Sequence, residues 1–130
     1  MTKRGIEALA EALKAAFEGD VAFHEVMPPQ VIAPAVIIVP DEEWMGPSTH
    51  GGISEAWQVL VASSLKSKQW FAELRKNNFR VQRATLGVGG IWRGATGPQA
   101  LGKDEARTVV SVNRVTFRYP PPDPNEETNP

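Results

Sequence analysis

The residues that could transfer protons or bind a metal are few, and most of them stand in one short segment. Asp41, Glu42 and Glu43 lie within ten residues of His50. Hard cations accept carboxylate clusters, and zinc takes histidine with carboxylates at defined spacings. The segment has neither an H-E-x-x-H motif nor the spacing of a calcium loop. We therefore expect a solvated acidic segment here and no metal site.

Nucleophilic catalysis has equally little support. A serine nucleophile needs a base that a third group holds in place. The only histidines are His24 and His50, there is no G-x-S-x-G motif, and the chain contains no cysteine. We expect a protein that is not an enzyme.

A glycine-rich stretch at residues 87–90 (Gly-Val-Gly-Gly) invites comparison with a phosphate-binding loop. The dinucleotide fingerprint requires G-x-G-x-x-G at the start of a helix, whose N-terminus holds the pyrophosphate. Here Ile91, Trp92 and Arg93 follow, and then a segment rich in glycine and proline. Glycine within a strand is typical of a bulge or bend. The pattern predicts a bent strand over residues 79–93 and no cofactor.

Charge is distributed unevenly along the chain. The formal net charge is −1, but residues 1–63 carry −6, residues 64–118 carry +8 and residues 119–130 carry −3. In the basic segment, arginines alternate with Phe79, Trp92 and Tyr119, which could bind a single-stranded nucleic acid by stacking and phosphate contacts. A basic face that meets an acidic face of a second copy explains the pattern equally well. A third possibility is that folding mixes the two signs on one surface.

The elements that must position these residues follow from periodicity and from helix- and strand-breaking residues. Apolar residues from Ile6 to Phe17 recur at helical spacing and end near Gly19, which favours a surface helix. The β-branched run at residues 35–39 lies between prolines and predicts a strand buried on both faces. The remaining predictions are a short strand at 21–26, a loop at 40–51, a strand at 52–63, a helix from 64 to 77 or 78, a loop at 94–106 and a strand at 108–119.

Length and composition indicate one domain over residues 1–119. The chain has 130 residues, of which 42% are hydrophobic and 22% charged, as in an ordinary globular protein. The longest apolar run, residues 35–39, is far too short to cross a bilayer. Residues 120–130 contain five prolines and three acids with nothing apolar to bury, so we expect a flexible acidic tail.

In its order of elements the sequence resembles the tail terminator (tail completion) proteins of long-tailed bacteriophages, over nearly all of residues 1–119. The resemblance rests on the helix with Ile6, Leu9 and Phe17, and on the order and spacing of four later segments. These are residues 29–40 (PQVIAPAVIIVP), 57–61 (WQVLV) leading into a helix, 85–90 (TLGVGG) and 112–119 (VNRVTFRY).

The resemblance implies a structural virion protein with an α/β (α+β) sandwich fold, in which two helices pack on a mainly antiparallel sheet. Copies would form a hexameric ring that caps the tail tube, ends its polymerisation and joins the tail to the head-side connector. DNA would pass through the ring without sequence-specific binding. The protein would be assembled in the host cytoplasm and lie at the head–tail interface, with no membrane contact. Another neck protein or a single-stranded nucleic-acid binding module is the alternative.

A closed ring uses a head-to-tail interface between two different surfaces. We therefore expect the acidic residues 1–63 to face the basic residues 64–118 of the next copy. The candidate apolar contacts are Trp44, Met45 and Trp92, and the candidate charged contacts are Arg80, Arg83 and Arg93.

Overall fold

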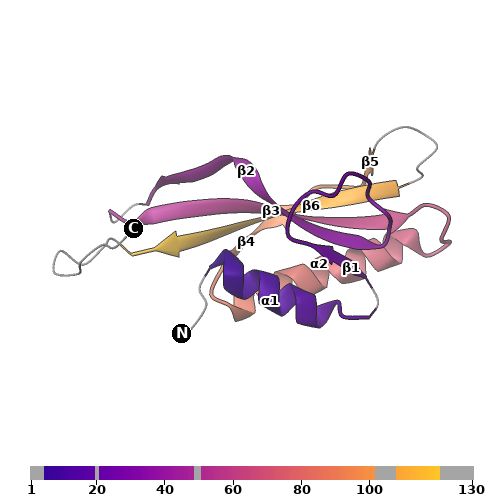
Figure 1. Cartoon of the computed structure of the whole chain (residues 1–130), viewed down its shortest axis with the longest axis horizontal. Coiled ribbons are helices and arrows are strands. Elements are labelled where there is room, and N and C mark those ends of the chain that lie inside the picture. The colour runs from indigo at the N-terminus through magenta and orange to yellow at the C-terminus, as the bar shows by residue number, and fades with distance from the viewer. Residues whose placement is uncertain (1–4, 20, 49–50, 102–107, 121–130) are drawn as a thin grey trace.

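The computed structural model describes residues 5–19, 21–48, 51–101 and 108–120. Two helices pack on one face of a six-stranded sheet (Figure 1). The elements in chain order are α1 (Ile6–Ala16), β1 (Ala22–His24), β2 (Ala35–Pro47), β3 (Ile53–Ser64), α2 (Trp70–Gly87), β4 (Ile91–Ala95), β5 (Gln99–Leu101) and β6 (Thr108–Tyr119).

The strand order is β1-β2-β3-β6-β4, and β5 pairs with β6 beyond the end of β4. Only β1 and β2 pair in parallel among the described strands; every other pairing is antiparallel. The expected α+β fold with a mainly antiparallel sheet and two packed helices is confirmed.

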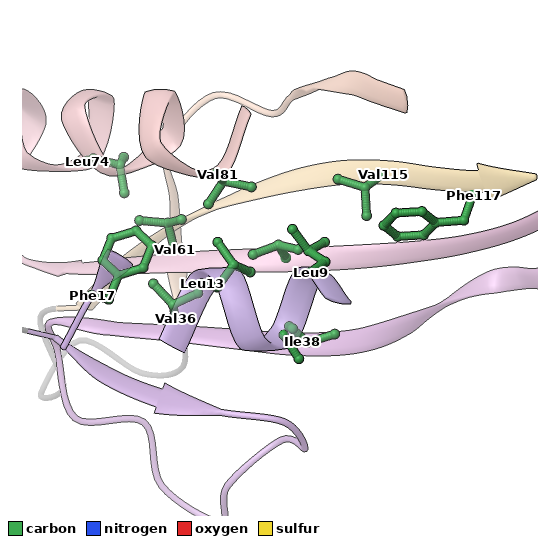
Figure 2. Packing of buried hydrophobic residues seen from close by; sticks show 12 residues of the cluster. Leu9, Leu13, Phe17, Val36, Ile38, Val61, Leu74, Val81, Val115 and Phe117 are labelled. Atoms are coloured by element: carbon green, nitrogen blue, oxygen red, sulfur yellow. The ribbon is translucent and has the colours of Figure 1, made fainter. Parts of the chain in front are cut away.

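The main core lies between the helices and the sheet (Figure 2). Side chains alternate between the two faces of a strand, so every second residue of β2, β3 and β6 points toward the helices. The stripe of α1 meets them through Leu9, Leu13 and Phe17, all fully buried. The sheet contributes Val36, Ile38, Val59, Val61, Val115 and Phe117, and α2 contributes Leu74 and Val81.

The opposite face of the sheet has a smaller core. Ala35, Ala62 and Val110 are buried there against Val31 and Ala33 from the connection between β1 and β2. This connection runs across the sheet in Figure 1. The prediction that residues 35–39 form a strand covered on both faces is confirmed for Ala35–Ile38.

The predicted loop at 40–51 is wrong for residues 40–47, which continue β2. Pro40 pairs with Trp57 and Met45 with Glu55, so four residues of β2 bulge opposite one residue of β3. The bulge accommodates the acids at 41–43, and the strand resumes after it. These acids, together with turn-forming residues such as Gly46 and Pro47, had predicted a loop. Pro40 and Pro47 are tolerated in β2 because β1 pairs only with residues 35–37. The rest of β2 is an edge strand, whose outer side needs no backbone N–H donor. Residues 49 and 50 lie outside the described part of the chain.

The predicted bounds of the second helix, residues 64 to 77 or 78, are wrong. Residues 65–69 form turns, and α2 runs from Trp70 to Gly87, through most of the predicted bent strand. Its buried stripe is Leu74, Asn77, Val81 and Thr85. Two of these side chains are polar, which conceals the helical period, and the Asn77–Asn78 pair resembles a helix end. Residues 87–90 end the helix, with Gly89 at φ 80°, and are not a bent strand.

The remaining predictions concern two strands, one loop and the C-terminal tail. The strand at 21–26 exists but is shorter, and the strand at 108–119 is confirmed with the same bounds. The predicted loop at 94–106 contains the end of β4 and all of β5, while residues 102–107 lie outside the described part. Residues 121–130 of the predicted tail also lie outside it.

Candidate assembly surfaces

The acidic segment that could have bound a metal instead supports the bulge of β2. Asp41 Oδ1 accepts hydrogen bonds from the Glu42 backbone N–H at 2.8 Å and from Gln58 Nε2 at 3.0 Å. Within residues 5–19, 21–48, 51–101 and 108–120, no three His, Asp or Glu side chains gather closely enough to hold a metal ion. In the same residues, neither helix is long and apolar enough to cross a membrane.

Beyond the helices, β2, β3 and β6 continue as a three-stranded sheet extension (Figure 1). It exposes three large apolar side chains, Trp44 (43% exposed), Met45 (50%) and Ile53 (44%). The Trp44 ring packs edge-on against Trp57, with 5.9 Å between centroids. Large exposed apolar groups on a paired, ordered element are typical of a contact with a partner.

A half-buried carboxylate fixes the base of the sheet extension. Glu55 accepts hydrogen bonds from Trp57 Nε1 at 2.7 Å and from the Tyr119 hydroxyl at 3.2 Å, both on Oε1. Burial, and then the negative charge and hydrogen bond of Glu55, raise the pKa of Tyr119 above its ordinary value. The Tyr119 ring packs against Gly5, where a Cβ would overlap the hydroxyl. The sequence analysis missed Glu55, although its spacing of two from Trp57 places both on one face of a strand.

The outward side of α2 is cationic and aromatic. We define the basic face as Arg75, Lys76, Arg80 and Arg83, which surround a hollow together with Phe71 and Phe79. The Arg75 guanidinium lies 5.1 Å from the Phe79 ring centroid, and that of Arg80 lies 5.3 Å from the Phe17 ring. The Phe71 and Phe79 side chains remain 55% and 50% exposed.

The acids of the first part of the chain gather elsewhere. We define the acidic edge as Glu7, Glu11, Glu18 and Glu25, which line two hollows along α1 and β1; the basic side chains among the described lining residues are Lys14 and His24. The hollow that Glu11, Glu18 and Glu25 share has no residue in common with the hollow of the basic face. The two surfaces nevertheless adjoin, because Arg80 of the basic face lies over the Phe17 ring, which lines the acidic hollow.

Trp92 of β4 lies beside α2, where a network of polar side chains holds its ring in place. Its Nε1 donates to Asn113 Oδ1 at 3.0 Å, and Asn113 Nδ2 donates to Asn78 Oδ1 at 2.9 Å and to the Val59 carbonyl at 3.2 Å. Asn78 in turn donates to Ser111 Oγ at 2.9 Å. Asn113 is fully buried, so this network fixes α2 and β4 against the centre of the sheet.

Beside this network is a groove between α2 and the β4–β5 connection, with a volume of about 450 Å³. We call it the α2–β4 groove. Phe71, Arg75, Phe79 and Gln82 line it from the helix, and Trp92 and Pro98 from the other side.

Arg93 is not brought together with Arg80 and Arg83. It lies on the sheet face away from the helices, in a hollow of about 420 Å³ that Asp41, Glu43, Met45 and Arg114 also line. Here, unlike at α2, folding does mix the two signs. The six predicted interface residues thus occupy the sheet extension, the basic face, the α2–β4 groove and this outer hollow.

Comparison with known proteins shows similarity at the level of the fold. No protein-family model and no curated sequence matches the chain. A solved structure described as the virion of a native gene transfer agent (GTA) particle contains a chain of similar fold, with a TM-score of 0.52 and 19% sequence identity. The similarity covers 87% of this chain and 95% of that one, so it spans nearly the whole of the other subunit's fold.

Proposed function

We propose that this chain is a structural protein of a phage-like virion, and specifically a tail terminator. The fold shared with a chain from a gene transfer agent virion supports the first part, since it covers 95% of that chain. The order of sequence segments that resembles tail terminators supports the second. The chain would act at the head–tail interface, where it would contact the tail tube protein and the head-side connector. No catalytic role is proposed.

The observation that carries the mode of assembly is that acids gather along α1 and β1, whereas bases gather on α2. A ring of identical copies needs two different surfaces that fit each other. The acidic edge runs along α1 and β1, and β1 is one edge strand of the sheet, whereas α2 lies beside α1 and packs over β3, β6 and β4. Opposite charges on these surfaces steer docking and set its register. The sheet extension, with Trp44 and Met45, is left to contact the tail tube or the connector.

Charge reversal tests this assembly. Replacing both Arg80 and Arg83 by Glu should leave the chain folded by circular dichroism but reduce ring formation at least tenfold by native mass spectrometry. A matched control replaces Arg93 and Arg114 by Glu, which changes the charge equally but on the outer face of the sheet. Replacing Glu18 and Glu25 by Lys in a second chain should restore mixed rings with the first variant. Equal loss in the control pair, or no loss in either, would refute the proposed interface.

A second candidate function is single-stranded nucleic-acid binding. Phe71 and Phe79 are half exposed among the four cations of the basic face, and bases stack on such rings while phosphates contact arginine. A labelled oligonucleotide titrated at several salt concentrations separates the two functions. A nucleic-acid module would bind at low salt with an affinity that falls steeply as salt rises. A tail terminator should show little affinity for short oligonucleotides at any salt concentration.

A further inference from the structure

We infer that the α2–β4 groove binds the proline-rich acidic segment 120–130 of a neighbouring copy. This inference requires self-association of the chain but not a place in a phage tail. The groove shares Phe71, Arg75 and Phe79 with the hollow of the basic face, but Arg80 and Arg83, on which the ring interface is tested, do not line it.

The groove has the chemistry of a polyproline-binding surface. Proline-rich segments dock into grooves lined by aromatic side chains, and their preformed extended helix loses little entropy on binding. Phe71, Phe79 and Trp92 line this groove, and the two phenylalanines are half exposed. The hydrogen bond from Trp92 Nε1 to Asn113 holds one wall in place before any ligand arrives.

The segment matches the groove in both shape and charge. Residues 120–124 read Pro-Pro-Pro-Asp-Pro, and Glu126 and Glu127 follow. A sequence with this proline content favours the polyproline II conformation. Arg75 lines the groove, and no acid does so among the described residues. A carboxylate of the segment would gain a cationic partner there and meet no like charge.

Geometry favours a neighbouring copy over the segment's own chain. Ser111 lines the groove and lies eight residues before Tyr119 on β6, which is about 26 Å at ~3.3 Å per residue. Residues 120–124 reach only about 16 Å beyond Tyr119 at ~3.1 Å per residue. Even if the chain reversed direction at once, its prolines would reach only the Trp92 end of the groove, which lies opposite Val115 about 13 Å from Tyr119 at ~3.3 Å per residue, and would not span it.

The absence of cysteine permits a direct cross-linking test with the full chain. A chain with Gln82→Cys, in the groove, is mixed with a chain carrying Asn125→Cys. The control replaces Ala72, which lies on α2 in the hollow of the basic face and does not line the groove. Under mild oxidation we expect the disulfide between positions 82 and 125 to form at least tenfold faster than that between 72 and 125.

Three further results bear on the inference. Replacing Asp123, Glu126 and Glu127 by their amides, or Phe79 by Ala, should each reduce the cross-link at least fivefold. Equal cross-linking at positions 72 and 82 would overturn the inference. So would a cross-link within one chain in dilute doubly substituted protein, or loss of the link on adding an oligonucleotide. Rings that form normally while the chains with Gln82→Cys and Asn125→Cys give no cross-link would refute this inference and leave the tail terminator proposal intact.

Discussion

At the scale of single residues, Asn113 specifies where three elements meet. A buried amide must have its hydrogen bonds satisfied, because an unpaired polar group in the core is costly. Asn113 binds Trp92 of β4, Asn78 of α2 and the Val59 carbonyl of β3 simultaneously. An apolar residue at this position could pack in several ways, whereas this arrangement of donors and acceptors fits only one placement of the helix and strand.

Replacing Asn113 by Ala should therefore lower the free energy of unfolding by about 2 kcal/mol or more, since it leaves the Trp92 and Asn78 groups without partners. Urea denaturation followed by tryptophan fluorescence measures this change. The exposed Gln99→Ala serves as the control and should change stability by less than about 0.5 kcal/mol. Equal stability of the two variants would show that the network contributes little.

Tyr119 gives a second prediction at this scale. It is the only tyrosine in the chain, so its ionisation can be followed alone by absorbance near 295 nm. Burial and the Glu55 carboxylate raise its pKa in the folded chain, so the midpoint should lie above the ordinary 10.0. The stability linked to this shift is complete below the unfolded pKa and is lost as pH rises through the folded one. Glu55→Gln should move the midpoint back toward 10.0; an unchanged midpoint would exclude Glu55 as a cause.

At the scale of elements, the end of α2 depends on how closely its last turn approaches β6. A Cβ at Gly90 would lie 2.6 Å from the Phe117 ring and 2.9 Å from Thr85 Cγ2. Gly87, three residues earlier, has nothing within 4 Å of such a Cβ. One glycine is thus required by packing and the other is not.

Gly90→Ala should lower the free energy of unfolding by about 1–3 kcal/mol, as overpacking of a core does. Gly87→Ala should leave stability unchanged or raise it by up to about 1 kcal/mol, because alanine favours the helix and restricts the unfolded chain. Thermal unfolding of both variants beside the parent chain measures the difference. A Gly90 variant as stable as the Gly87 variant would mean that the close approach to Phe117 relaxes without cost.

At the scale of the whole molecule, acids gather along α1 and β1 and bases on α2, although the net charge of the chain is only −1. Interactions between such exposed surfaces are screened over about 8 Å at physiological salt. Self-association through them should therefore be strongest at low ionic strength and weaken steadily as salt is added.

Sedimentation velocity at about 0.05, 0.15 and 0.5 M salt tests this expectation. The parent chain should shift toward smaller species as salt rises, and the variant with Arg80 and Arg83 replaced by Glu should be small throughout. Association that strengthens with salt would indicate an apolar interface instead, and would direct attention to Trp44 and Met45 on the sheet extension.

Periodicity predicts elements well where apolar residues alone form the stripe. The helix that begins at Ile6 and the strand Thr108–Tyr119 were predicted because their buried faces are nearly continuous in sequence. The second helix was misplaced because Asn77 and Thr85 occupy buried positions of its stripe. The predicted interface residues are large apolar or cationic side chains, but nothing in their order showed that Arg93 faces away from Arg80.

By itself the amino-acid sequence determined the first helix, the last strand and the unequal distribution of charge, because each depends on neighbours along the chain, whereas the α+β fold was implied by the family resemblance. Only the tertiary structure decided that acids line α1 and β1 while bases line α2, and that an aromatic groove opens beside β4. Those arrangements depend on which strands pair and which helix face is buried, and such contacts join residues far apart in sequence.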